Sequence, residues 1–132
     1  WVSVTTAERF PGLTLMEDWP DEALEKLNID SRTAVVTLTH DPKLDDPALL
    51  VALRSEAFYI GSLGSRRTHA KRVDRLKEEG LTDAQIGRIH APVGLDLGGR
   101  AQAEIAIATM AQIVQALHAA PAAPERKVEK AA

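Results

Sequence analysis

A glycine-containing turn at residues 61–65 runs directly into Arg66 and Arg67, and this segment carries the strongest chemical signal in the sequence. Glycine lets a ligand approach the backbone closely, and the free N–H groups at the start of a helix attract anions. Arginine in a first helical turn costs about 0.3–1 kcal/mol because its charge opposes the helix dipole, whereas a bound phosphate or carboxylate reverses that sign. Guanidinium groups also bind such anions bidentately. The segment therefore predicts an anion-binding site, the alternative being arginines that face solvent or pair with acids such as Asp41.

His40 and Asp41 follow the preceding predicted strand and form a second candidate group. Ligands of open α/β sheets bind outside the carboxyl ends of the strands, so this pair and the glycine turn are expected to border one crevice. The alternative for Asp41 is helix-capping and turn chemistry around Pro42. His69 lies within one helical turn of Arg66, where it either contacts the same ligand or has a structural role. The candidate ligand-binding residues are His40, Asp41, Gly61, Ser62, Gly64, Ser65, Arg66 and Arg67.

The remaining reactive groups do not form a recognisable catalytic pattern. The sequence has no cysteine and no Gly-x-Ser-x-Gly nucleophile motif, and His90 and Asp96 lack the spacing of metal ligands. We therefore predict no catalytic residue and no metal site. Residues 66–77 hold six Lys or Arg against Asp74, but no aromatic side chain lies among them and two glutamates follow. This pattern, with a net charge of −3, favours a solvated helix face over a nucleic-acid-binding one.

The elements that must position these residues alternate between strands and helices. Strands are predicted at residues 13–16, 34–39 and 57–60, and one short strand is expected within the glycine-rich stretch 90–99. Helices are predicted at residues 20–27, 47–54, 66–79, 82–89 and 101–119, with Asp45 or Asp46 as the cap of the second. Gly80 is predicted to end the third helix, and Thr82 with Gln85 is predicted to form a capping box at the start of the fourth. Short connections between such elements indicate βαβ units. The predicted fold class is α/β, a Rossmann-like parallel sheet with flanking helices.

The 132 residues suit one domain at residues 1–119, followed by a tail at 120–132 whose composition predicts disorder. Hydrophobic residues make up 45% and charged residues 27%, which is the balance of a globular protein. No apolar run approaches the roughly 20 residues of a bilayer span, and no basic-then-apolar leader opens the sequence. We therefore expect neither membrane insertion nor secretion. Because the sequence starts at Trp1 and offers few strands for a doubly wound fold, we expect a first strand–helix–strand to be missing from it.

Three motifs occur in order along the chain. They are Thr39-His40-Asp41, then Tyr59-Ile60-Gly61-Ser62-Leu63-Gly64-Ser65-Arg66-Arg67, then His90-Ala91-Pro92-Val93-Gly94-Leu95-Asp96-Leu97-Gly98. Together they resemble the C-terminal Rossmann-like domain of the xanthine dehydrogenase accessory factors, the XdhC/CoxI family. The resemblance covers about residues 5–117. It implies a cytoplasmic, homodimeric maturation factor that binds molybdenum cofactor, protects it during sulfuration by a cysteine desulfurase, and helps to insert it into a molybdenum hydroxylase such as xanthine dehydrogenase.

On this resemblance we expect a chaperone domain that carries molybdenum cofactor, rather than a catalyst in its own right. The phosphate of molybdopterin would then lie at the candidate residues, and the partners would be the hydroxylase, the desulfurase and a second copy, with no nucleic acid and no membrane. The alternative is the Rossmann domain of an NAD(P)-dependent oxidoreductase. That function needs an upstream glycine-rich phosphate turn and an acid for the ribose, and the sequence shows neither.

Overall fold

The computed structural model describes residues 8–9, 11–39 and 41–119, and it confirms the alternation of strands and helices. Its strands are β1 (Ala34–Thr37), β2 (Tyr59–Ser62) and β3 (Ile89–His90). Its helices are α1 (Pro20–Lys26), α2 (Pro42–Leu53), α3 (Arg66–Glu78), α4 (Asp83–Ile86) and α5 (Gln102–Ala119). Each helix in this part of the chain is too short or too polar to cross a membrane.

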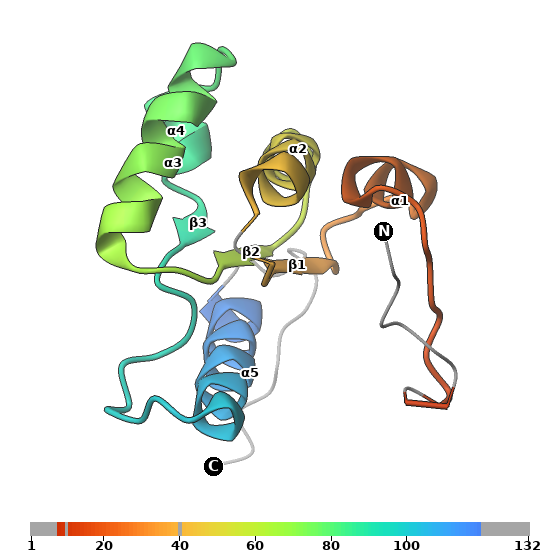
Figure 1. The fold of residues 1–132 in the computed structure, drawn as a ribbon, viewed down its shortest axis with the longest axis vertical. Helices are drawn as coiled ribbons and strands as arrows, with labels where there is room; N and C mark the ends of the chain where they lie inside the picture. Colours follow the sequence, from red (N-terminus) through yellow and green to blue (C-terminus); the bar gives the residue numbers. More distant parts are fainter. Residues whose placement is uncertain (1–7, 10, 40, 120–132) are drawn as a thin grey trace, which may run out of the picture.

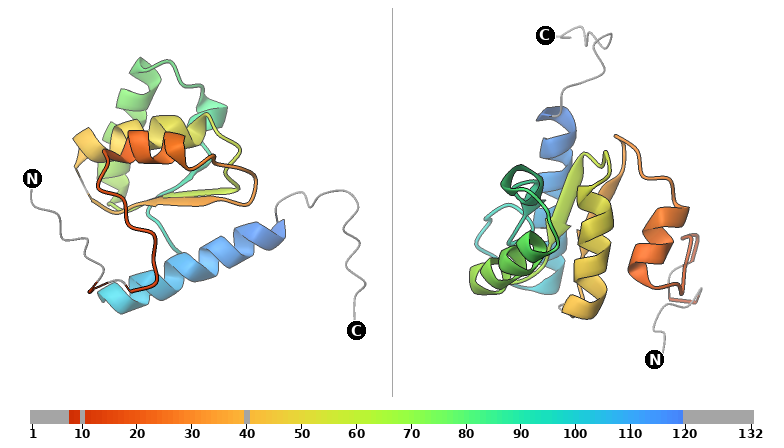
Figure 2. Two further views of the ribbon diagram at one scale, coloured as in Figure 1. Left: turned by 90° about the vertical axis from the view of Figure 1, so that its right-hand side faces the viewer. Right: turned by 90° about the horizontal axis from the view of Figure 1, so that it is seen from above.

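The strands form one parallel sheet in the order β1-β2-β3, so that β2 is paired on both edges. Ala34 lies opposite Tyr59 in the first pair, and Ile60 lies opposite Ile89 in the second. Figure 1 shows α1, α2 and α3 on one face of the sheet and α5 on the other. Figure 2 shows the same two helical layers from other directions. The predicted Rossmann-like α/β architecture is therefore confirmed.

The main hydrophobic core lies between the sheet and the α2–α3 layer. Leu49 and Leu53 of α2, Ile60 of β2 and Leu76 of α3 are almost completely buried within it. Every residue of β2 is buried, as expected for a central strand of a parallel sheet covered on both faces. The core thus fixes the carboxyl end of β2, from which the chain turns into α3.

The start of α2 differs from the prediction. Asp41, not Asp45 or Asp46, is the N-cap, and its Oδ1 accepts a hydrogen bond from the Lys43 backbone N at 3.0 Å. Pro42 then occupies the first helical position, where a missing N–H costs nothing. Pro47, expected at that position, lies inside the helix instead. The sequence offered two Asp–Pro starts, and the earlier one begins the helix.

Other boundaries differ at the ends of strands. Residues 13–16 form no strand, so that prediction is wrong, and β1 ends at Thr37 rather than at residue 39. The stretch 90–99 contributes only His90 to β3, which begins at Ile89, and α4 ends at Ile86 rather than at residue 89. Gly80, with φ of +90°, follows α3 as predicted, and Thr82 and Gln85 form the predicted capping box. The predicted tail at 120–132 lies outside the described residues.

Candidate functional site

The carboxyl ends of β1 and β2 lie side by side, and each leads into a capped helix. Asp41 caps α2, and Ser65 caps α3 by accepting a hydrogen bond from the Thr68 backbone N at 3.1 Å. Asp41 therefore performs the capping role that was its alternative interpretation. Because β1 and β2 are paired in parallel, the starts of α2 and α3 lie at one edge of the sheet. His40 lies outside the described residues, so its placement stays a prediction.

Gly61 and Ser62 are buried members of β2, so the prediction that they belong to the turn is wrong. A Cβ on Gly61 would lie 2.6 Å from Val93 Cγ2 and 2.8 Å from Tyr59 Oη, which means that neighbouring side chains already fill this space. Ser62 is completely buried, and its Oγ shares a 2.7 Å hydrogen bond with Thr37 Oγ1. Both residues hold the strand in place, and neither presents a free surface to a ligand.

The turn itself consists of residues 63–65. Gly64 has φ of +134°, a conformation that side-chain-bearing residues rarely adopt. A Cβ there would lie 3.3 Å from Thr68 Cγ2 and 3.6 Å from Arg72 Nη2. Gly64 therefore lets the chain reverse sharply between the buried strand and the first turn of α3. Ser65, which follows it, is exposed.

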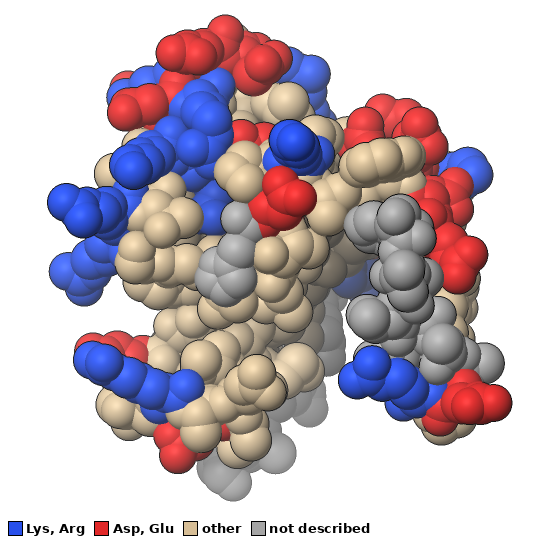
Figure 3. Space-filling model, viewed as in Figure 1, with Lys and Arg blue, Asp and Glu red and all other residues tan. Residues whose placement is uncertain are grey.

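Arg66 and Arg67 form the start of α3 and are both exposed. No hydrogen bond or ion pair joins either guanidinium to another side chain among residues 8–9, 11–39 and 41–119, and the first turn of α3 contains no acid. Lys and Arg side chains gather over α3 in Figure 3, whereas acidic side chains cover its opposite end. Two unneutralised guanidinium groups at the positive end of a helix dipole are suited to an anion.

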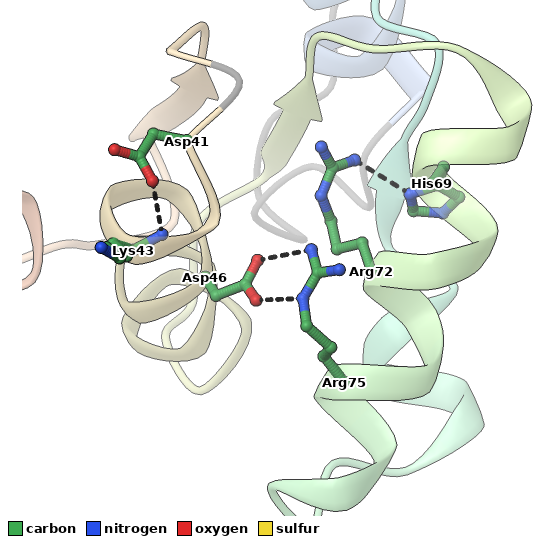
Figure 4. Close-up of polar contacts among 6 residues, drawn as sticks. All are labelled: Asp41, Lys43, Asp46, His69, Arg72 and Arg75. Atoms are coloured by element: carbon green, nitrogen blue, oxygen red, sulfur yellow. Dashed lines mark hydrogen bonds and ion pairs between the residues drawn. The ribbon is translucent and has the colours of Figure 1, made fainter.

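Arg72 is a feature of this edge that sequence reasoning missed. It is only 2% exposed, and its guanidinium lies beneath the turn, with Nη2 donating to the Leu63 carbonyl at 3.2 Å. Its Nη1 lies 3.1 Å from His69 Nδ1, and its Nε has no partner among the described residues. Figure 4 shows Arg72 and His69 joined by this contact. Burial lowers the pKa of Arg72, and the nearby Asp45 and Asp46 carboxylates oppose that effect. Arg72 lies four residues before the buried Leu76, so both residues are on the same face of α3. This spacing is the signal in the sequence that could have placed Arg72 on the inward side.

Two acids of α2 face this arginine-rich helix. Asp46 accepts from Arg75 Nε at 2.6 Å and from Nη2 at 3.3 Å, a bidentate pair that joins α2 to α3 (Figure 4). The same pair raises the pKa of Arg75. Asp45 is 3% exposed, and its Oδ1 accepts from Thr39 Oγ1 at 2.7 Å. The Asp46–Arg75 pair therefore joins α2 to α3 beyond the first turns of α3, and the Asp45–Thr39 bond connects α2 to the segment that follows β1.

Comparison with known proteins identifies the family. The XdhC Rossmann domain family matches residues 2–113. The chain belongs to the XdhC family. The XdhC chain is 38% identical over 85 residues to the molybdenum cofactor insertion chaperone PaoD of Escherichia coli (strain K12), an alignment that covers 64% of this chain and 27% of PaoD. It is 34% identical over 99 residues to the uncharacterized protein YqeB of the same organism, covering 75% of this chain and 18% of YqeB.

A solved structure with a similar fold also supports membership of the XdhC family. The crystal structure of a xanthine dehydrogenase from Bacillus halodurans superposes with a TM-score of 0.65 at 30% identity, covering 84% of this chain and 31% of that protein. The resemblance stated from the three sequence motifs is therefore confirmed. The XdhC chain spans less than a third of the length of each of these relatives.

Proposed function

We propose that this XdhC domain binds molybdenum cofactor and serves as a chaperone in the maturation of molybdenum hydroxylases of the xanthine dehydrogenase type. Membership of the family supports this role, as does similarity to a relative named as a molybdenum cofactor insertion chaperone. The chain acts as a carrier of its cargo and not as a catalyst. In this proposal the protein holds molybdenum cofactor while a cysteine desulfurase sulfurates it, and it then helps to insert the cofactor into the client enzyme. The protein acts as a homodimer in the cytoplasm.

The unpaired guanidinium groups of Arg66 and Arg67 are the observation that carries the proposal. Molybdopterin ends in a phosphate, and a phosphate neutralises two cations that have no other partner among the described residues. The turn supplies further donors through its backbone N–H groups, at the positive end of the α3 dipole, while the Ser65 hydroxyl is already engaged with Thr68 as the helix cap. The residues present therefore fit the anionic end of the cargo.

The other candidate residues support this site indirectly. Gly61 and Ser62 hold the end of β2, Gly64 permits the turn, and Asp41 fixes the start of the neighbouring helix. We propose that His40, next to Asp41 in the sequence, lies at the same edge of the sheet as this site. Of these candidate residues, only those at 64–67 would contact the phosphate, so mutations at Gly61 and Ser62 would act on binding through the fold.

Co-elution of molybdenum cofactor with the full chain tests this function. The cofactor is released from a molybdoenzyme, mixed with protein and separated by gel filtration, and the bound pterin is quantified. We expect the wild type to retain cofactor and the Arg66→Ala/Arg67→Ala variant to lose at least about tenfold in affinity, since charge-assisted hydrogen bonds are worth roughly 1.5–3 kcal/mol each. The charge-matched control is Arg32→Ala/Lys77→Ala, which removes two exposed basic residues outside the turn.

Three results would contradict the proposal. The first is failure of the wild-type chain to retain cofactor, and the second is equal retention by the Arg66→Ala/Arg67→Ala variant. The third is an equal loss in the Arg32→Ala/Lys77→Ala control, which would reduce the effect to net charge. Tight binding of NAD(P)H with no binding of molybdenum cofactor would favour the oxidoreductase alternative instead.

A further inference from the structure

We propose that His69 contacts the ligand of this same site, presenting its Nε2–H as a neutral hydrogen-bond donor to a phosphate oxygen, and that Arg72 is the positioning residue that holds the ring. This inference rests on the proposed function, because it takes the anion to lie beside Arg66 and Arg67. It adds a third side-chain donor to those of Arg66 and Arg67, and it gives a role to the buried Arg72.

The position of His69 follows from the geometry of α3. The ring lies one turn after Ser65, whose backbone carbonyl accepts from the His69 N–H at 2.9 Å. Side chains of a helix lean toward its N-terminus, so we infer that the ring of His69 is directed toward the turn that holds Arg66. The side chain is half-buried, and its Nε2 has no hydrogen-bond partner in the described part of the chain. One ring nitrogen is therefore engaged and the other is free.

The tautomer of His69 follows from the chemistry of its partner. Arg72 Nη1 lies 3.1 Å from His69 Nδ1, and a guanidinium has donors but no acceptor. Nδ1 must therefore accept, which leaves the ring proton on Nε2. Arg72 cannot turn away easily, because it is buried and its Nη2 is bound to the Leu63 carbonyl of the turn. The same side chain thus fixes both the turn and the ring.

The surroundings of the ring keep it neutral. Burial lowers the pKa of His69, and the adjacent Arg72 charge lowers it further. Arg72 is itself influenced by the charges of Asp45 and Asp46 on α2 and of Arg75 on α3, and Asp46 is already paired with Arg75. Arg66 and Arg67 at the start of α3 are the other basic groups of the proposed site. Protonation of Nδ1 would also break the bond to Arg72. His69 therefore donates one directional hydrogen bond to an oxygen acceptor and adds no third positive charge to the site.

The first measurement is of the tautomer itself. Two-bond ¹H–¹⁵N correlation spectra of the full chain distinguish a protonated from an unprotonated ring nitrogen, and variants at His69 assign the resonances. We expect Nε2 to be protonated and Nδ1 to be unprotonated at pH 7 in the wild type. The opposite tautomer, or a charged ring at that pH, would overturn the proposal.

The second measurement is of binding, with inorganic pyrophosphate titrated onto the full chain and followed through the backbone amides of residues 63–68. His69→Asn keeps an acceptor for Arg72 but removes the outer N–H, so we expect about tenfold weaker binding with an unchanged melting temperature. His69→Gln carries an amide N–H₂ to nearly the position of Nε2, so it should recover part of that loss. His118→Asn, the same change at an exposed site on α5, is the matched control and should bind like the wild type.

The outcomes separate this inference from the proposed function. Wild-type affinity for pyrophosphate in the His69→Asn variant would overturn the role of His69 while leaving cofactor binding by Arg66 and Arg67 intact. Pyrophosphate binding that depends on His69, combined with no retention of molybdenum cofactor, would support the anion site and refute the choice of cargo. Absence of pyrophosphate binding in the wild type would overturn the inference.

Discussion

The position of Gly61 beside the candidate ligand turn suggests a role in binding, but its neighbours indicate a role in packing. We therefore expect Gly61→Ala to destabilise the fold. The new methyl group would lie 2.6 Å from Val93 Cγ2 and 2.8 Å from Tyr59 Oη, inside normal contact distances. Overpacking of this kind costs about 1–3 kcal/mol. Displacing Tyr59 would also disturb its 2.6 Å hydrogen bond to Gln112, which is worth about 0.5–1.5 kcal/mol. We therefore expect a loss of about 2–4 kcal/mol in the free energy of unfolding.

Urea denaturation of the full chain measures this loss, and a double-mutant cycle identifies its cause. Val93→Ala removes the nearest contacting methyl group, so the Gly61→Ala/Val93→Ala protein should be less destabilised than the sum of the single variants. A coupling of about 0.5–3 kcal/mol is typical of residues in direct contact. Strict additivity, or a Gly61→Ala protein as stable as the wild type, would refute the packing role. Loss of anion binding at unchanged stability would restore the ligand-approach interpretation.

Three further changes test other parts of the fold. Arg88→Ala should lower the free energy of unfolding by about 2 kcal/mol, as measured in urea, because the Arg88 guanidinium donates three hydrogen bonds at 2.6–3.0 Å to carbonyls at and beyond the end of α2. Arg88→Lys should retain part of this stability. Burial raises the pKa of Tyr59 to about 12, so the stability that the neutral phenol contributes is present below pH 10 and lost between pH 10 and 12. Absorbance of the phenolate reports this titration directly, since the chain has one tyrosine. Tyr59→Phe should remove the loss of stability at alkaline pH. Asp41→Ala should cost about 1 kcal/mol through loss of the α2 cap, and Asp41→Asn much less, as thermal denaturation would show.

The order of elements could be predicted because each carries a local signal. Alternating apolar runs and helical segments identified the parallel sheet, and Thr82 with Gln85 and the glycine at residue 80 marked helix boundaries correctly. The end of β2 could not be predicted in this way. Glycine at residue 61 usually indicates a turn, but here the strand continues because Gly61 pairs with both Val36 and His90 and lies under Val93. Those partners are distant in the sequence.

The candidate site was predicted only in part for a similar reason. Arg66 and Arg67 could be selected because their place after a glycine-containing turn is visible in the sequence. Arg72 could not be distinguished from the other basic residues of α3, since its burial depends on packing against the turn and on the acids of α2. Asp45 and Asp46 were interpreted as helix caps, whereas one is buried against Thr39 and the other pairs with Arg75. Tertiary contacts, and not local pattern, determine these roles.

The most direct test of the central claim pairs a change in the ligand with a change in the protein. The affinity of the full chain is measured for molybdopterin and for the same pterin after enzymatic removal of its phosphate, in the wild type and in Arg66→Ala/Arg67→Ala. The account predicts that the wild type binds the phosphorylated ligand at least about tenfold more tightly and that the variant binds both ligands equally. A variant that still prefers the phosphorylated ligand by the same factor would show that the phosphate lies elsewhere.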